Sequence, residues 1–175
     1  ALIFGGTPNL AITEAWDGSS WTEVNDLNTG RRGLRGAGTS TLGLAMGGGP
    51  PTVAATEEWS FPSTPTVQEG QLWVKTATGA SSVLKGYQAQ GTGSWASGGN
   101  LNTARRGLGG AGVKTGALAF SGFTTTLIAN TEAYNGSTWS EVNDVNTARQ
   151  LLGSAGTVNT ASLGFGGDTD PPNGT

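Results

Sequence analysis

The chain has 175 residues, of which 31 are glycine and only 12% are charged, and its formal net charge is −3. An acidic chain of this kind is poorly suited to nucleic acid or an anionic membrane as its main partner. It contains neither cysteine nor histidine. This excludes a disulfide framework, thiolate or imidazole metal ligands, and Ser-His or Cys-His nucleophile systems. We therefore expect no cofactor and no metal, and no apolar run approaches the roughly 20 residues of a membrane span.

In chain order, the first feature is an apolar stretch that ends in glycine and recurs three times. Its four copies are ALIFGG at 1–6, GLAMGG at 43–48, ALAFSG at 117–122 and SLGFGG at 162–167. The next is an acidic–aromatic stretch, found as TEAW at 13–16, TEEW at 56–59 and TEAY at 131–134. Such self-similarity at a fixed period is the signature of a repeat architecture.

Two further stretches complete the unit. One ends in arginine, as LNTGR at 27–31, LNTAR at 101–105 and VNTAR at 145–149, and a run of small residues follows, as GAGT at 36–39, GAGV at 110–113 and SAGT at 154–157. The unit is therefore about 42–45 residues long, and the middle copy carries an insert of roughly 30 residues. We divide the chain into a partial unit (1–30), a unit with an insert at 60–90 (31–100), a third unit (101–148) and a partial unit (149–175).

The pattern within a unit is that of strands, because no apolar stripe with helical spacing lasts two turns. Each unit contains four short apolar or alternating segments. Asp17-Gly18 and Asn135-Gly136 stand between the third and fourth segments, and such pairs favour a two-residue type I′ hairpin turn. Four antiparallel strands per unit of this length predict an all-β propeller blade.

One tryptophan occupies the same place in each unit, at Trp21, Trp95 and Trp139. A buried tryptophan contributes roughly 150–250 Å² of packed surface. We expect these residues to pack between adjacent blades, because recurrence in every unit is a property of a scaffold. A platform for a ligand is the alternative.

The repeated positions resemble the kelch repeat: a double glycine after an apolar strand, then an acidic–aromatic pair, a tryptophan and an arginine. They are Gly5, Gly6, Glu14, Trp16, Trp21 and Arg31; Gly47, Gly48, Glu57, Trp59, Trp95 and Arg105; Gly122, Glu132, Tyr134, Trp139 and Arg149; and, in the last copy, Gly166 and Gly167. Ser121 replaces one glycine in the third copy. The segments LNTARRGLGGAG and TEAYNGSTWSEVND are similar in sequence to kelch-like propellers in structural proteins of tailed phages, especially marine ones. This resemblance implies a propeller fold and a virion structural or tail-fibre role.

The aligned glutamates (Glu14, Glu57, Glu132) and arginines (Arg31, Arg105, Arg149) allow two interpretations. We expect one structural ion pair or hydrogen-bond clamp per blade, and a ring of functional carboxylates is the alternative. RRGLRG and RRGLGG also recur with the blades, so we do not interpret them as a nucleic-acid patch.

The insert is the segment that the repeat does not explain. GQLWVKT and SSVLKGYQ read as two strands of a hairpin, and Trp73, Lys75, Lys85 and Tyr87 make it the most distinctive candidate for ligand binding. A hairpin that merely decorates the blade is the other interpretation. Asp168, Asp170 and Asn173 could suit a hard cation such as calcium, but a polar turn is favoured because the ligand spacing is incomplete.

The resemblance implies a non-enzymatic module on a virion, such as a tail fibre, spike or decoration protein that displays loops to a host-surface glycan or protein. The alternative is a propeller segment of a secreted carbohydrate-active enzyme or a bacterial surface adhesin. The matched elements amount to little more than three blades, whereas propellers have about four to eight. We therefore expect the chain to be part of a longer polypeptide or to complete a ring with other subunits as a homo-oligomer.

Overall fold

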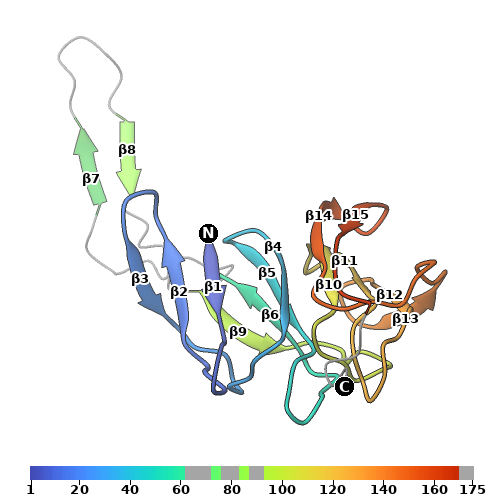
Figure 1. The fold of residues 1–175 in the computed structure, drawn as a ribbon. Helices are drawn as coiled ribbons and strands as arrows, with labels where there is room; N and C mark the ends of the chain where they lie inside the picture. The colour runs from blue at the N-terminus through green and yellow to red at the C-terminus, as the bar shows by residue number, and fades with distance from the viewer. Residues whose placement is uncertain (62–71, 76–82, 87–92, 170–175) are drawn as a thin grey trace.

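The structure is a computed structural model that describes residues 1–61 and 93–169, together with the backbone of 72–75 and 83–86. Within these residues it contains strands and no helix, so no helix long and apolar enough for a membrane span is found there. The strands form four blade-like sheets and one separate hairpin (Figure 1). All pairings are antiparallel, which confirms the all-β prediction.

The four sheets follow one another along the chain. The first comprises β1 (Leu2–Phe4), β2 (Thr13–Trp16) and β3 (Trp21–Val24). The second comprises β4 (Arg35–Gly38), β5 (Leu42–Met46), β6 (Thr56–Ser60) and β9 (Ser94–Ser97). The third comprises β10 (Gly109–Val113), β11 (Gly116–Phe120), β12 (Thr131–Tyr134) and β13 (Trp139–Val142). The fourth comprises β14 (Gly153–Val158) and β15 (Ala161–Phe165).

The predicted insert forms a hairpin of its own between the third and fourth strands of the second sheet. It consists of β7 (Leu72–Lys75) and β8 (Val83–Gly86). Its register places Trp73 opposite Lys85. The prediction of two strands in this segment is therefore confirmed.

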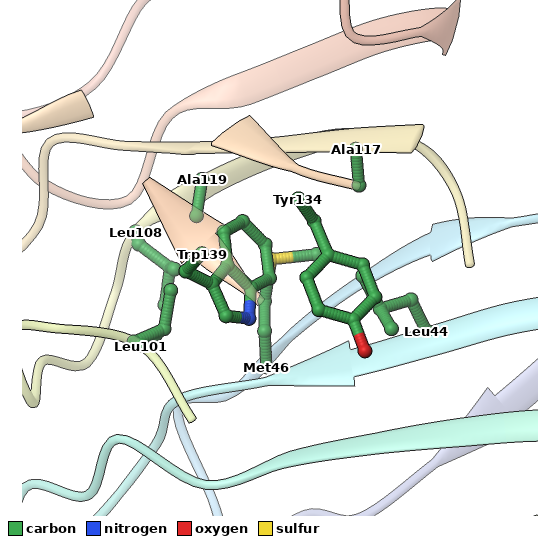
Figure 2. Packing of buried hydrophobic residues seen from close by; sticks show 8 residues of the cluster. All are labelled: Leu44, Met46, Leu101, Leu108, Ala117, Ala119, Tyr134 and Trp139. Atoms are coloured by element: carbon green, nitrogen blue, oxygen red, sulfur yellow. The ribbon is translucent and has the colours of Figure 1, made fainter. Parts of the chain in front are cut away.

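The core lies between consecutive sheets, because each sheet buries an apolar face against the next. Between the second and third sheets, Leu44 and Met46 of β5 pack with Leu108, Tyr134 and Trp139 (Figure 2). Between the first and second sheets, Trp59 and Trp95 form a second cluster with Leu2 and Phe4 against it. Small residues on the first strands permit this approach: a Cβ on Gly36 would lie 2.6 Å from the Phe4 ring.

The three repeated tryptophans differ in burial. Trp95 and Trp139 are 6% and 5% exposed, and both lie between two sheets, as the sequence predicts. For Trp21 the expectation of burial is wrong: it is 45% exposed, and its ring contacts the ring of Trp16 on the same sheet, with ring centroids 5.4 Å apart. The physical reason is that no described sheet covers that face of β2 and β3.

The predicted type I′ hairpin turns are also wrong. The β2–β3 connection has four residues, from Asp17 to Ser20, and Gly18 is its only residue with positive φ. Asp17 Oδ1 accepts hydrogen bonds from the backbone N–H groups of Ser19 and Ser20 at 2.8 and 2.9 Å, and these bonds lower the pKa of the exposed carboxyl to about 2. Asn135 makes the same bonds in the third sheet. The side-chain acceptor therefore fixes a wider turn, as Asp and Asn commonly do.

Ser121 shows how the third unit replaces a glycine. Its φ is 60°, close to the 64° of Gly47. The buried hydroxyl donates to the Ile128 carbonyl at 3.0 Å and accepts the Arg149 N–H at 3.1 Å. Two hydrogen bonds thus accompany a left-handed conformation that non-glycine residues seldom adopt.

Candidate functional site

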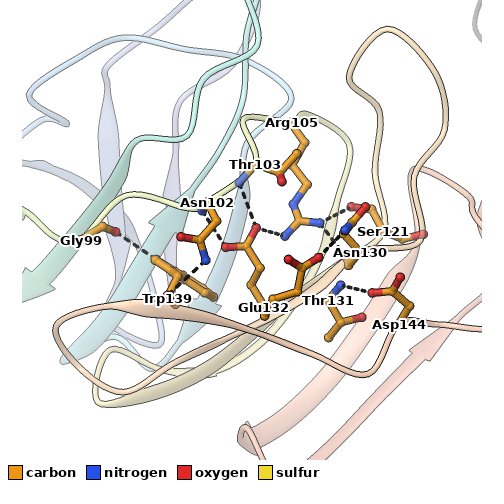
Figure 3. A network of polar contacts seen from close by, with 11 residues as sticks. Gly99, Asn102, Thr103, Arg105, Ser121, Asn130, Thr131, Glu132, Trp139 and Asp144 are labelled. Carbon is orange, nitrogen blue, oxygen red and sulfur yellow. Dashed lines mark hydrogen bonds and ion pairs between the residues drawn. The ribbon is translucent and has the colours of Figure 1, made fainter.

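The repeated arginine and glutamate form a buried clamp within the third sheet (Figure 3). The Arg105 guanidinium donates to Glu132 Oε1 at 2.6 Å, and the two side chains are 0% and 1% exposed. The other carboxylate oxygen accepts the Asn102 N–H at 2.7 Å. Burial lowers the pKa of Arg105, and the negative charge of Glu132 opposes that shift.

The same clamp occurs in the second sheet. Arg31 donates to Glu57 at 3.0 Å, and Asn28 N–H donates to the other oxygen of Glu57 at 2.7 Å. In both sheets the arginine precedes the first strand and its glutamate lies on the third strand of the same sheet. The geometry favours the structural interpretation over a ring of functional carboxylates.

The residues that follow the repeated arginines Arg31, Arg105 and Arg149 lie in a different environment from the clamp. Arg32, Arg106 and Gln150 each form a backbone bridge with the residue after the repeated Gly-Gly or Ser-Gly pair, the partners being Gly49, Phe123 and Asp168 respectively. Arg106 and Phe123 exchange two backbone hydrogen bonds of 3.0 and 2.9 Å. Its guanidinium also lies 4.8 Å from the centroid of the Phe123 ring, a cation–π contact that restricts the side chain.

The next residues link the three units to one another. Gly107 N–H donates to the Gly33 carbonyl at 2.9 Å, and Leu151 N–H donates to the Gly107 carbonyl at 2.7 Å. All three have positive φ, of 63°, 61° and 55°. These equivalent turns are therefore held side by side, with Leu151 in a position that the other units give to glycine.

A cavity of about 450 Å³ opens over these turns. Its lining residues are Thr7, Arg32, Gly33, Gly49, Pro50, Arg106, Gly107, Gln150 and Leu151. Two arginines and no acidic residue line it, although the whole chain carries a net charge of −3. A local excess of positive charge in a hollow favours an anionic ligand.

Arg35 on β4 connects the first strands of three consecutive sheets through hydrogen bonds. Its Nε donates to the Leu108 carbonyl at 2.9 Å, and its guanidinium also donates to the Leu152 carbonyl. These acceptors precede β10 and β14, so one side chain spans three sheets. Burial lowers the pKa of Arg35, and the backbone carbonyls take up its donors.

The candidate binding residues of the insert are not brought to this cavity by any described contact. The backbone places Trp73 and Lys75 on β7 and Lys85 on β8, and their role stays a prediction. Tyr87, Asp170 and Asn173 lie outside the described residues. Within the described part of the chain, no cluster of three or more acidic residues could hold a metal ion.

Sequence reasoning missed Arg32 and Arg106 because it assigned both arginines of each RRGL motif to the repeat. A signal was available. The first arginine aligns with Arg149, whereas the second aligns with Gln150, so only the first is shared by all three units. A position that varies beside an invariant clamp is free to carry a binding role.

Comparison with known proteins finds likeness to solved structures. No known family matches the chain, and no curated protein matches it either. The solved structure titled "Structure of YjhT" superimposes with a TM-score of 0.64 at 11% sequence identity. The match covers 91% of this chain but 46% of that one, so the chain spans less than half the length of this neighbour. At this identity the likeness shows a shared fold alone.

Proposed function

We propose that the chain is a non-enzymatic recognition module built from kelch-type propeller blades, and that the arginine-lined cavity binds an acidic group of a host-surface glycan. The observation that carries this proposal is the pairing of Arg32 and Arg106 in one cavity whose lining has no carboxylate. The blade assignment is supported by the four-stranded antiparallel sheets and by the resemblance of the repeat sequence to kelch-like propellers of phage structural proteins.

The chemistry of the cavity suits a carboxylate or sulfate. Arginine presents a planar fork of donors that matches such oxyanions, and it stays charged at any physiological pH. Arg106 is partly ordered by Phe123 before any ligand arrives, which reduces the entropy lost on binding. Sialic and uronic acids carry a suitable carboxylate beside hydroxyl groups.

We place the module on a virion surface, as the resemblance of the repeat wording suggests. A single exposed cavity of this kind gives weak binding, and many copies on one particle convert weak sites into firm attachment through avidity. Proteomic analysis of purified particles that contain the encoding genome tests this placement, since the chain should be among their proteins.

The binding site is tested on an array of sialylated, uronic-acid-containing and neutral glycans. The wild-type chain should bind acidic glycans in preference to neutral ones, with an affinity that falls as salt rises. Arg106→Gln and Arg32→Gln should each weaken binding by about tenfold or more, as expected for loss of a charged hydrogen bond.

Lys114→Gln is the matched control, because it removes one positive charge from a residue that does not line the cavity. It should leave glycan binding unchanged. If this variant weakens binding as much as Arg106→Gln, the interaction reflects overall charge and the cavity is not the site. Hydrolysis of a glycan by the purified chain would instead support a carbohydrate-active enzyme.

A further inference from the structure

Two halves of a clamp remain open at opposite ends of the structure. Glu14 on β2 and Arg149 before β14 have no ion-pair partner among the described residues. Arg149 donates to the Gly166 carbonyl at 3.1 Å, but no described strand beside β15 carries a glutamate like those that Arg31 and Arg105 bind. The negative charge of Glu14 on the first sheet and the positive charge of Arg149 beside the fourth sheet are therefore complementary.

The two halves match in register as well as in charge. Glu14 lies opposite Ile3, as Glu132 lies opposite Ala119. Arg149 precedes β14 by four residues, as Arg105 precedes β10. A sheet made of β14, β15, β2 and β3 would thus reproduce the clamp geometry of the third sheet.

The first and fourth sheets, which carry Glu14 and follow Arg149 respectively, each have fewer described strands than the four-stranded sheets, and each has the strands that the other lacks. Among the described residues, the first sheet has no counterpart of β4 or β10, and a cavity of about 550 Å³ lies between β1 and β4. The fourth sheet has its first two strands but no third or fourth strand in the described residues. Its β15 side chains Leu163 and Phe165 are 69% and 57% exposed.

The aromatic residues of the first sheet show the same incompleteness. Trp16 and Trp21 are 37% and 45% exposed, whereas their counterparts Tyr134 and Trp139 are 1% and 5% exposed beneath a neighbouring sheet. A sheet that covered Trp16 and Trp21 would remove a large apolar area from water, which favours association.

We propose that two copies of this chain associate head to tail, with β14 and β15 of one copy joining β2 and β3 of the other, so that Arg149 of the first clamps Glu14 of the second. The inference builds on the blade architecture and is independent of glycan binding. In the joined sheet β15 takes the place of β1, and Phe165 takes the position of Phe4 against Gly36. We expect β1 to be displaced rather than β15, because β1 has three paired positions with β2 whereas β15 has five with β14.

The length of the structural neighbour favours a second copy as the occupant. This chain matches 46% of that structure, so two copies correspond to about nine tenths of its length. The closed pair repeats the junction twice, because each copy supplies one Glu14 and one Arg149.

Charge reversal tests the junction directly. Wild-type chain should sediment at twice the 17.6 kDa chain mass. Glu14→Arg places two arginines at both junctions and Arg149→Glu places two glutamates there, so each variant alone should be monomeric. A mixture of the two variants restores both pairs, and dimers should form only on mixing.

Lys114→Glu serves as the control, since it reverses a charge away from the junction and should leave the dimer intact. If a reversal variant loses its circular dichroism signal of sheet, Glu14→Gln and Arg149→Gln replace it and should weaken dimerisation by about 30-fold or more. A wild-type chain that is monomeric at all concentrations would overturn the proposal. Folded variants that fail to associate on mixing would overturn it too, and would assign the open ends to another segment or partner.

Discussion

Nη2 of Arg105 lies 2.6 Å from Oε1 of Glu132, and the two side chains are 0% and 1% exposed. Glu132 also accepts the backbone N–H groups of Asn102 and Thr103, so the pair ties the segment that leads into a sheet to the third strand of that sheet. Breaking such a pair leaves an unpaired charge in a buried site. The resulting loss of stability is far larger than the stability that an exposed ion pair contributes.

The first prediction concerns this clamp. Glu132→Gln should lower the free energy of unfolding by about 3–5 kcal/mol, because the Arg105 charge then lacks its counter-ion. Lys114→Ala removes an ion pair of 3.7 Å to Glu58 whose side chains are 21% and 20% exposed. It should cost only about 0–1 kcal/mol. Urea titrations measure both, and equal losses would contradict the structural role of the clamp.

The second prediction compares two tryptophans that occupy the same repeat position. Trp139→Ala should destabilise the chain by about 3–5 kcal/mol, since the indole is buried and its Nε1 donates to the Gly99 carbonyl. Trp21→Ala should cost well under half as much in a dilute monomeric sample, because Trp21 is 45% exposed. Thermal melts of the two variants provide the comparison, and a larger loss for Trp21 would refute the observed burial.

The third prediction uses Leu151, which has a φ of 55° and is 65% exposed. A left-handed conformation costs a residue with a side chain about 1–2 kcal/mol, whereas glycine adds about 0.5–1 kcal/mol of entropy loss. Leu151→Gly should therefore stabilise the chain by up to about 1 kcal/mol. The reverse change, Gly107→Leu, should destabilise it. A lower denaturation midpoint for Leu151→Gly would show that the turn is not strained.

The fourth prediction concerns the ionisation of Tyr134. Burial, together with its hydrogen bond to Glu58 Oε1 at 2.5 Å, raises the pKa of this hydroxyl to about 12. The unfolded chain ionises at the ordinary value near 10, so the stability that this tyrosine contributes is present below pH 10 and is lost as the pH rises from about 10 to 12. Ultraviolet titration of tyrosinate should show one late-titrating tyrosine, and Tyr134→Phe should remove it. Ordinary titration of Tyr134 would contradict the buried contact.

The sequence predicted the repeat unit and its strands because the alternation and the glycine pairs are local signals. The turns were wrong because Asp17 and Asn135 use a side-chain oxygen to bind two backbone N–H groups, and a dipeptide pattern does not reveal that. Trp21 was placed wrongly because burial depends on a covering sheet, which is a tertiary property. The clamp was anticipated as a pair of residue types, but its partners join only when the chain folds back over 26 or 27 positions.

The candidate site was less accessible to prediction. Arg32 and Arg106 lie 74 positions apart in the sequence, and tertiary backbone links such as those between Gly33, Gly107 and Leu151 bring them to one cavity. The insert drew attention instead, because its lysines and aromatic residues stand out from the repeat. A search for positions that vary beside repeated ones would have pointed to the cavity.

The most direct test of the central claim is an NMR titration of the isotope-labelled chain with a carboxylated monosaccharide such as glucuronate. If the arginine-lined cavity is the binding site, the amide signals of Gly33, Gly107 and Leu151 should shift in a saturable way, and glucose should leave them unmoved. Signals of β7 and β8 should stay in place. Saturable shifts confined to Trp73, Lys75 and Lys85, or no saturable shift at all, would contradict the claim.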